Sequence, residues 1–126
     1  MNGVVVRKAK LVSDDPRRSI FEIMNGEISI KNLKVLKIKK GRLVLGNHWH
    51  TYPEVMFILK GWGHYHMKNI DTNEEEEFDL KEGDVVFRTG RIVHAGYFEE
   101  DSIIIDAASE SYISADFNDV RQEIMK

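Results

Sequence analysis

The sequence contains no cysteine and only two prolines in 126 residues. Without cysteine, disulfide bonds and thiolate metal sites are excluded, so any metal ion would have to bind imidazole and carboxylate groups. Long apolar runs are missing too. The opening M-N-G-V-V-V-R-K-A-K has three apolar residues in a row before charges begin, and no stretch approaches the ~18 apolar residues of a membrane helix. We therefore expect no membrane partner and, by default, a cytoplasmic protein.

An excess of positive charge is also absent. Lysine and arginine number 18 against 21 aspartates and glutamates, a formal net charge of −3. Without a broad basic face, nucleic acid is not an expected partner. Hydrophobic residues make up 42% and charged residues 31%, which is typical of a soluble globular chain. At this length we expect residues 1–126 to form one domain with one core.

Short β-branched runs ending at glycine, asparagine or aspartate dominate the sequence and predict strands. About ten short strands without intervening helices predict an all-β sandwich or small barrel. The expected strands are Val4–Val12, Ser19–Met24, Ile28–Ile38, Leu43–His48, Val55–Leu59, Gly63–Asn69, Glu76–Leu80, Val85–Arg88, Val93–Phe98 and Ser102–Ala107.

One segment departs from this pattern. Phe117, Val120 and Ile124 fall on one helical face, and Ser114 can cap the start of a helix. We therefore expect a short C-terminal helix, Ser114–Met125, packed on the barrel.

The stretch N-H-W-H-T-Y-P-E, residues 47–54, concentrates metal-ligand residue types. Side chains alternate along a strand, so His48 and His50 point to the same side. Glu54 has matching parity, provided that a bend at Pro53 returns its carboxylate to that place. With His94, the set offers three imidazoles and one carboxylate, which suits Mn, Fe, Ni, Cu or Zn. The alternative is ordinary polar histidines with separate hydrogen-bond partners.

The spacing of these residues resembles that of the cupin superfamily. The pattern G-x6-H-x-H-x3-E-x6-G, from Gly41 to Gly61, is one residue away from the first cupin motif. Gly83 to His94 resembles the second motif, which ends in a histidine. The resemblance covers roughly Leu36–Ala108.

The resemblance implies a fold and a ligand set. The fold would be the cupin double-stranded β-helix, a jelly-roll barrel with one divalent transition metal ion inside one end. On that pattern His48, His50, Glu54 and His94 fall on the four ligand positions. Two features depart from it: Arg88-Thr89-Gly90 stands in place of P-x-G, and Phe98 in place of an asparagine.

A second histidine pair lies in G-W-G-H-Y-H-M, residues 61–67. The alternation assigns Tyr65 and Met67 to the interior, which places His64 and His66 on the opposite face with Trp62. No carboxylate that would complete a second metal site is evident near this pair in the sequence. We expect a solvent-facing or subunit-facing strand, and a homodimer would suit such a face.

Three functions remain open, because a fold does not name a reaction. The first is an epimerase or isomerase that removes a proton beside a sugar carbonyl. The second is a metal-dependent dioxygenase of a small molecule, and the third is a cupin that binds a ligand without catalysis. Lys60, Tyr65, Arg88, Arg91 and Tyr97 could line the barrel mouth, where the arginines would suit a phosphate or carboxylate.

Further resemblances favour a sugar or nucleotide-sugar ligand. D-D-P-R-R-S-I-F-E, residues 14–22, is similar to the opening segment of cupins that act on nucleotide sugars, including dTDP-sugar ketoisomerases and capsular polysaccharide-assembly enzymes. G-N-H-W-H, residues 46–50, resembles the capsular enzymes, and S-Y-I-S-A-D-F-N-D-V-R, residues 111–121, the ketoisomerase tail. The ketoisomerases have glutamine in place of Glu54 and generally need no metal. That difference favours a metal-bound relative.

Overall fold

The computed structural model describes residues 1–111 and 120–126, and within them it contains strands and no helix. The strands are β1 (Val4–Lys8), β2 (Lys10–Asp15), β3 (Arg18–Glu22), β4 (Asn32–Ile38), β5 (Gly41–Trp49), β6 (Glu54–Lys60), β7 (Trp62–Asn69), β8 (Glu75–Lys81), β9 (Asp84–Arg88), β10 (Ile92–Phe98), β11 (Ser102–Ala108) and β12 (Val120–Arg121). No helix of the described residues has the length and apolarity needed to cross a membrane.

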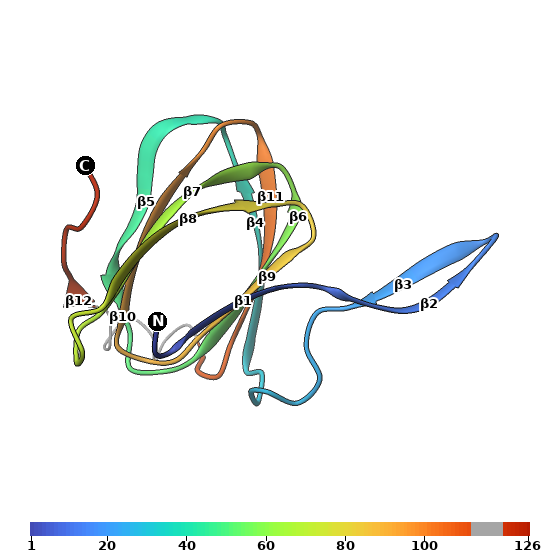
Figure 1. Cartoon of the computed structure of the whole chain (residues 1–126), viewed down its shortest axis with the longest axis horizontal. Coiled ribbons are helices and arrows are strands. Elements are labelled where there is room, and N and C mark those ends of the chain that lie inside the picture. Colours follow the sequence, from blue (N-terminus) through green and yellow to red (C-terminus); the bar gives the residue numbers. More distant parts are fainter. Residues whose placement is uncertain (112–119) are drawn as a thin grey trace.

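Two five-stranded sheets make up the body (Figure 1). One has the strand order β1-β9-β6-β11-β4 and the other the order β12-β5-β10-β7-β8. From β4 onward, successive strands alternate between the sheets, except for the β7–β8 hairpin. This alternation is typical of a double-sheet jelly roll. The main core lies between the sheets, because Ile58 and Ile104 of one sheet pack with Met67 and Phe98 of the other.

The expectation of an all-β fold is confirmed, whereas that of a closed barrel is not. Among the described strands, no backbone pairing joins one five-stranded sheet to the other. The short connection at Lys39-Lys40 carries the chain from β4 in one sheet directly to β5 in the other, so the layers meet through side chains.

The predicted C-terminal helix is wrong where the structure describes it. Val120 and Arg121 form β12 and pair with Trp49 and His48 of β5. Beyond them, the side chain of Asn47 accepts hydrogen bonds from the backbone N–H groups of residues 124 and 125 at 2.9 and 3.1 Å. The edge of β5 therefore provides hydrogen-bond partners for backbone groups that would otherwise have bonded within a helix. Residues 114–119 of the predicted helix lie outside the described residues.

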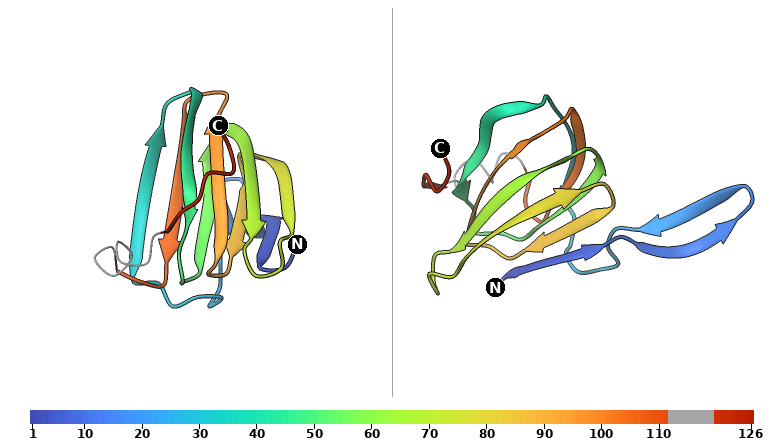
Figure 2. Two further views of the ribbon diagram at one scale, coloured as in Figure 1. Left: turned by 90° about the vertical axis from the view of Figure 1, so that its left-hand side faces the viewer. Right: turned by 45° about the horizontal axis from the view of Figure 1, so that its top comes forward.

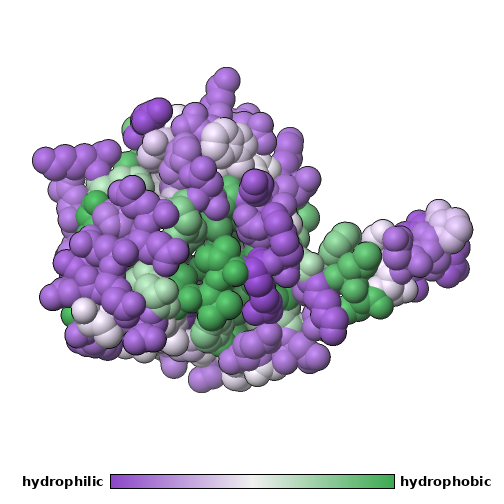
Figure 3. All heavy atoms as spheres, in the orientation of Figure 1, coloured by the Kyte–Doolittle hydropathy of each residue, from purple (hydrophilic) through white to green (hydrophobic). Residues whose placement is uncertain are grey.

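The predicted strand Val4–Val12 divides into two. β1 pairs with β9, whereas β2 leaves the body and pairs only with β3. We call this two-stranded hairpin, residues 10–22, the arm. Figures 1 and 2 show it projecting from the body. Apolar side chains on both of its strands are exposed, including Leu11 and Phe21 at 49% and 57% (Figure 3).

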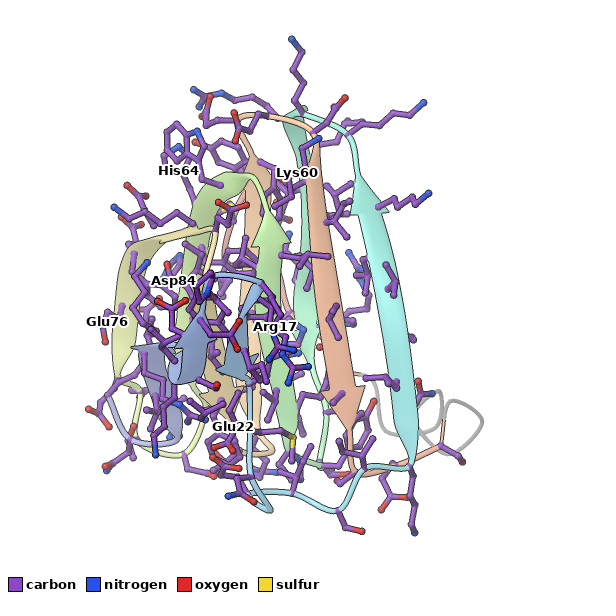
Figure 4. The ribbon with its side chains drawn as sticks, turned by 90° about the vertical axis from the view of Figure 1, so that its right-hand side faces the viewer. Arg17, Glu22, Lys60, His64, Glu76 and Asp84 are labelled. Carbon is purple, nitrogen blue, oxygen red and sulfur yellow. The ribbon has the colours of Figure 1, made fainter. Side chains whose placement is uncertain are left out.

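The sheet that contains β4 also has an apolar outer face. Leu33 and Val35 of β4 are 66% and 63% exposed, and Leu59 of β6 is 45% exposed. Figure 4 looks onto this side of the molecule, from which the arm projects toward the viewer. The segment before β4 covers part of this outer face, because Ile28 is buried against Val55 and Val85.

Candidate active site between the sheets

A cavity of about 370 Å³ opens between the two sheets. Both sheets line the cavity with their inward-facing residues: Lys34, Leu36, Ile38, Leu45, Gly46, His48, His50, Tyr52, Glu54, Met56, Tyr65, Arg88, His94, Ile104 and Asp106. An apolar cavity of this size with a few polar groups is the usual form of a small-molecule site.

Three imidazoles gather in this cavity, as the sequence predicts. The ring centroids of His48 and His50 are 4.7 Å apart, and those of His48 and His94 are 4.6 Å apart. One ring nitrogen from each of the three lies within 4.8 Å of the others. Whether they bind a metal ion stays a prediction.

A bulge in β5 brings His48 beside His94. Pairing between β5 and β10 skips Asn47, so that Gly46 faces Ala95 while His48 faces His94. Gly46 and Asn47 have φ angles of 91° and 58°, in the left-handed region that glycine and asparagine tolerate. A Cβ atom on Gly46 would overlap the carbonyl oxygen of His94. Glycine is therefore required for the close approach of the two strands.

Glu54 lies beside the imidazoles and is held by two other groups. Its Oε1 is 2.6 Å from Nε2 of His50, and its Oε2 is 3.1 Å from the guanidinium of Arg88. Burial would raise the pKa of Glu54, but the charge of Arg88 and hydrogen bonds from His50 and Asp106 lower it far below its usual range. Glu54 is therefore an ionised acceptor, and the Nε2 of His50 carries a proton toward it.

The pKa of Asp106 shifts in the opposite direction to that of Glu54. Burial, followed by its contact with Glu54, raises the pKa of Asp106 to about 8. At neutral pH Asp106 is protonated and donates to Glu54. Two neighbouring carboxyl groups thus differ in protonation because only one of them directly contacts Arg88.

Arg88 enters the same cluster from β9 and is only 4% exposed. Its guanidinium lies 3.2 Å from Nε2 of His94, whose Nδ1 is 3.2 Å from the carbonyl oxygen of Ile92. A guanidinium only donates and a carbonyl only accepts, so His94 carries its proton on Nδ1. Burial, with the nearby charge of Arg88, holds the pKa of His94 well below its ordinary value.

Two tyrosines complete the polar end. The ring of Tyr52 stacks on His50 with centroids 4.8 Å apart. The hydroxyl of Tyr65 donates to the sulfur of Met56 at 3.7 Å, and burial raises the pKa of Tyr65 well above its usual value. The hydroxyl of Tyr65 is therefore protonated at neutral pH.

Sequence reasoning missed Tyr52, Asp106 and Lys34. Tyr52 stands within the N-H-W-H-T-Y-P-E stretch but does not share the metal-ligand chemistry. Asp106 interrupts the apolar run of β11 at an inward position, a signal that a carboxyl group is buried. Lys34 has the same parity as Leu36 and Ile38 along β4, which could have marked it as facing inward.

Three of the five residues expected at the mouth lie elsewhere. Lys60 is exposed at the end of β6 and does not line the cavity (Figure 4). Arg91 pairs with Asp71 at 2.9 Å and lies over the ring of Trp49. Tyr97 faces outward, because its position in β10 has the opposite parity to that of His94. The expectation that these three residues line the mouth was therefore wrong. Arg88 and Tyr65 do line the cavity.

The second histidine pair lies on the outer face of its sheet, as predicted. The structure corrects the expectation that carboxylates are lacking there, because neighbouring strands supply them. Nδ1 of His64 is 2.6 Å from Asp79 and its Nε2 is 2.9 Å from Glu99. His66 lies 3.1 Å from Glu75. Within the part of the chain that the structure describes, the one group able to hold a metal ion is that of the three inner histidines.

The donor atoms in the cavity do not favour a metal ion, although three imidazoles alone can hold one. Nε2 of His94 faces a donor on Arg88, and both oxygens of Glu54 are held by other side chains. Among the described residues, every buried side-chain nitrogen and oxygen has a hydrogen-bond partner. An ion on Nε2 of His94 or on the Glu54 oxygens would therefore compete with contacts that are already made.

Comparisons with solved structures support a cupin-like fold. No protein-family model matches the sequence, and no curated protein does. The TDP-quinovose 3,4-ketoisomerase WlaRB of Campylobacter jejuni is 15% identical with a TM-score of 0.82, over 97% of this chain and 95% of that chain. A mutant of QdtA, a 3,4-ketoisomerase of Thermoanaerobacterium thermosaccharolyticum in complex with TDP-4-keto-6-deoxyglucose, is 19% identical with a TM-score of 0.80, over 97% and 89%.

An epimerase has a similar structure. ChmJ, a 3'-monoepimerase from Streptomyces bikiniensis in complex with dTDP-quinovose, is 16% identical with a TM-score of 0.79, over 94% of this chain and 69% of that chain. At these identities the likeness establishes a shared fold.

Proposed function

We propose that this chain is an isomerase or epimerase that moves a proton beside the carbonyl group of a nucleotide-linked sugar. Three lines support the proposal: the segments similar to nucleotide-sugar cupins, the fold shared with enzymes of TDP-sugars, and a cavity whose polar end carries acid–base groups. The contact between His50 and Glu54 carries the most weight.

This contact gives His50 a defined role. Because Nε2 donates its proton to an ionised Glu54, the lone pair of His50 lies on Nδ1. When Nδ1 accepts a proton, the carboxylate stabilises the imidazolium that forms. The stack with Tyr52 fixes the plane of the ring. A fixed imidazole with a carboxylate behind it is suited to act as a general base.

The proposed reaction begins when His50 removes a proton from the carbon beside the sugar carbonyl, leaving an enolate. Return of the proton to the other face of that carbon gives an epimer. Delivery to the former carbonyl carbon, while the proton of the neighbouring hydroxyl group moves to the former carbonyl oxygen, shifts the ketone along the ring. Both outcomes balance without an added oxidant or reductant. Tyr65, whose hydroxyl is held by a weak sulfur acceptor, could instead donate to the enolate oxygen.

Solvent exchange tests the proposal. The protein is incubated in D₂O with TDP-4-keto-6-deoxyglucose, and the sugar is followed by NMR. We expect deuterium at the carbon beside the carbonyl, and exchange at least about 100-fold slower in His50→Asn, since general base catalysis contributes at least that much. His64→Asn, which changes an outer histidine, serves as the matched control and should exchange like the wild type. Equal exchange in His50→Asn would contradict the proposal.

A metal-dependent dioxygenase is the second candidate, and the convergence of His48, His50 and His94 is the observation that favours it. This function requires dioxygen uptake that depends on added Fe(II), whereas proton exchange does not. A ligand-binding cupin without catalysis would bind TDP, as a thermal shift would reveal, and would show neither activity.

The arm and the outer face beside it support a homodimer. A two-stranded hairpin is at best marginally stable alone in water, so the exposed Leu11 and Phe21 of the arm need a covering surface. Leu33 and Val35 are exposed on β4. Figure 4 shows that the β4 sheet and the arm lie on the same side of the molecule. In a two-fold dimer each copy contributes the same patch, so one contact would cover both arms and both faces. We therefore propose a second copy of this chain as the partner.

A further inference from the structure

The inward-facing end of β9 places a permanent positive charge among the predicted metal ligands. The guanidinium of Arg88 lies 3.1 Å from Oε2 of Glu54 and 3.2 Å from Nε2 of His94, two of the four ligand atoms that the cupin pattern implies. An arginine side chain keeps its charge at every pH at which the protein is folded. The cluster therefore already contains a cation.

The sheet holds Arg88 in this place. Arg88 is paired directly opposite Glu54 in the ladder between β9 and β6, and opposite Val4 in the ladder between β9 and β1. A strand paired on both sides cannot turn its side chains over without breaking its register. The Arg88 side chain is also almost wholly buried. Arg88 is therefore a fixed, buried part of the site and not a mobile surface side chain.

The lone pair of His94 also argues against a metal ion at this place. His94 uses the proton on Nδ1 for the carbonyl of Ile92, which leaves Nε2 as its single metal-binding atom. An N–H group of Arg88 points at that atom. A dication on Nε2 would have to displace the N–H group and lie against the guanidinium. The same residue departs from the second cupin motif, because Arg88 stands where the motif has proline.

We infer that Arg88 takes the place of a metal ion in this site. Its guanidinium organises His94 and Glu54, supplies the positive charge, and keeps divalent ions off the group of His48, His50 and His94. Removal of the guanidinium opens a mononuclear site for a transition metal. The inference concerns metal content alone, so it stands or falls separately from the proposed reaction.

The test compares cobalt binding in variants purified without a metal-affinity tag. Every protein carries His64→Ala and His66→Ala, so that the outer histidines bind no ion. With Arg88 intact, we expect no stoichiometric metal by elemental analysis and no visible absorption on titration with Co²⁺. Arg88→Met should gain roughly one equivalent of Co²⁺, with the absorption of imidazole-bound cobalt. Adding His94→Ala should remove that equivalent.

Arg88→Lys is the matched control, because it retains a buried positive charge and should gain no ion. Arg88→Met leaves Glu54 as an unpaired buried charge, which could prevent the protein from folding. In that case Arg88→Met combined with Glu54→Gln removes both charges and keeps all three imidazoles. One equivalent of metal in the protein with Arg88 intact, lost on His94→Ala, would overturn the inference. Folded Arg88→Met variants that bind no more Co²⁺ than this parent would overturn it equally. If neither variant folds, the titration with Arg88 intact decides the question alone.

Discussion

At the scale of single residues, position within the two sheets separates histidines of the same chemistry. His94 faces inward, where burial and Arg88 keep it neutral. His64 faces outward, where the hydrogen bond to Asp79 raises its pKa, burial lowers the pKa by less, and the hydrogen bond to Glu99 raises it further. One side of the β7–β10 sheet thus carries the neutral imidazole of His94, and the other an imidazole that readily becomes charged.

The raised pKa of His64 predicts a pH dependence of stability. A group with a raised pKa in the folded state stabilises the fold fully below its unfolded value, and this contribution disappears as pH rises through the folded value. His64→Asn should therefore lower the urea midpoint at about pH 5.5 and change it little at about pH 9, on either side of an ordinary histidine pKa of ~6.5. A loss that is equal at both pH values, or larger at the higher one, would contradict this assignment.

At the scale of elements, the bulge in β5 determines whether the imidazoles meet. Gly46 and Asn47 add one residue to β5 relative to β10, which aligns His48 with His94. The sequence contains both residues, but no periodicity reveals which strand lies beside β5 or that β10 approaches so closely. The bulge was therefore not predicted, although the residues that it aligns were.

Gly46→Ala tests the bulge against a matched position. Gly26 has a similar φ, 83° against 91°, but a Cβ there would meet nothing within 4 Å. Both alanines carry the strain of a left-handed backbone, about 1–3 kcal/mol, and only Gly46→Ala also meets the backbone of His94. We expect Gly46→Ala to lower the free energy of unfolding more than Gly26→Ala, and to lower proton exchange as well. Equal losses would show that the close approach is unimportant.

The limits of sequence reasoning follow from the same elements. Alternation along each strand was enough to place His48, His50, Tyr65 and Met67 inward. It could not show that Asp106 lies beside Glu54, because that contact depends on β11 pairing with β6. Helical spacing misled at the C-terminus, where Phe117, Val120 and Ile124 predicted a helix, because the pairing of Val120 with the edge of β5 is a tertiary feature.

At the scale of the whole molecule, apolar surface on the arm and on the β4 sheet supports the proposed dimer. The outward-facing Trp62, on which the dimer was first predicted, is 38% exposed but belongs to the opposite sheet. The proposed contact therefore differs from the one that the sequence indicated. The single-domain organisation of residues 1–126 and the cytoplasmic location stay predictions.

Phe21→Asp tests the dimer. Because Phe21 is 57% exposed on the arm, an aspartate there costs the isolated chain little, but would place a charge in the apolar contact. Sedimentation should show a dimer for the wild type and a monomer for the variant. Leu43→Asp in β5 is the control, since Leu43 is 87% exposed and lies outside the arm and the β4 sheet. A wild-type monomer, or an unchanged dimer in Phe21→Asp, would rule out this contact.

The alternation of strands between the sheets also has a kinetic consequence. The strand order β9-β6-β11-β4 joins segments far apart in the sequence, and β11 is the link between β4 and β6. During synthesis β4 must wait for nearly the whole chain to leave the ribosome before it can pair within its sheet. Pairings of such long range make folding slow. Until β11 arrives, the apolar strands of the nascent protein are open to aggregation, a period in which chaperones would have their greatest effect.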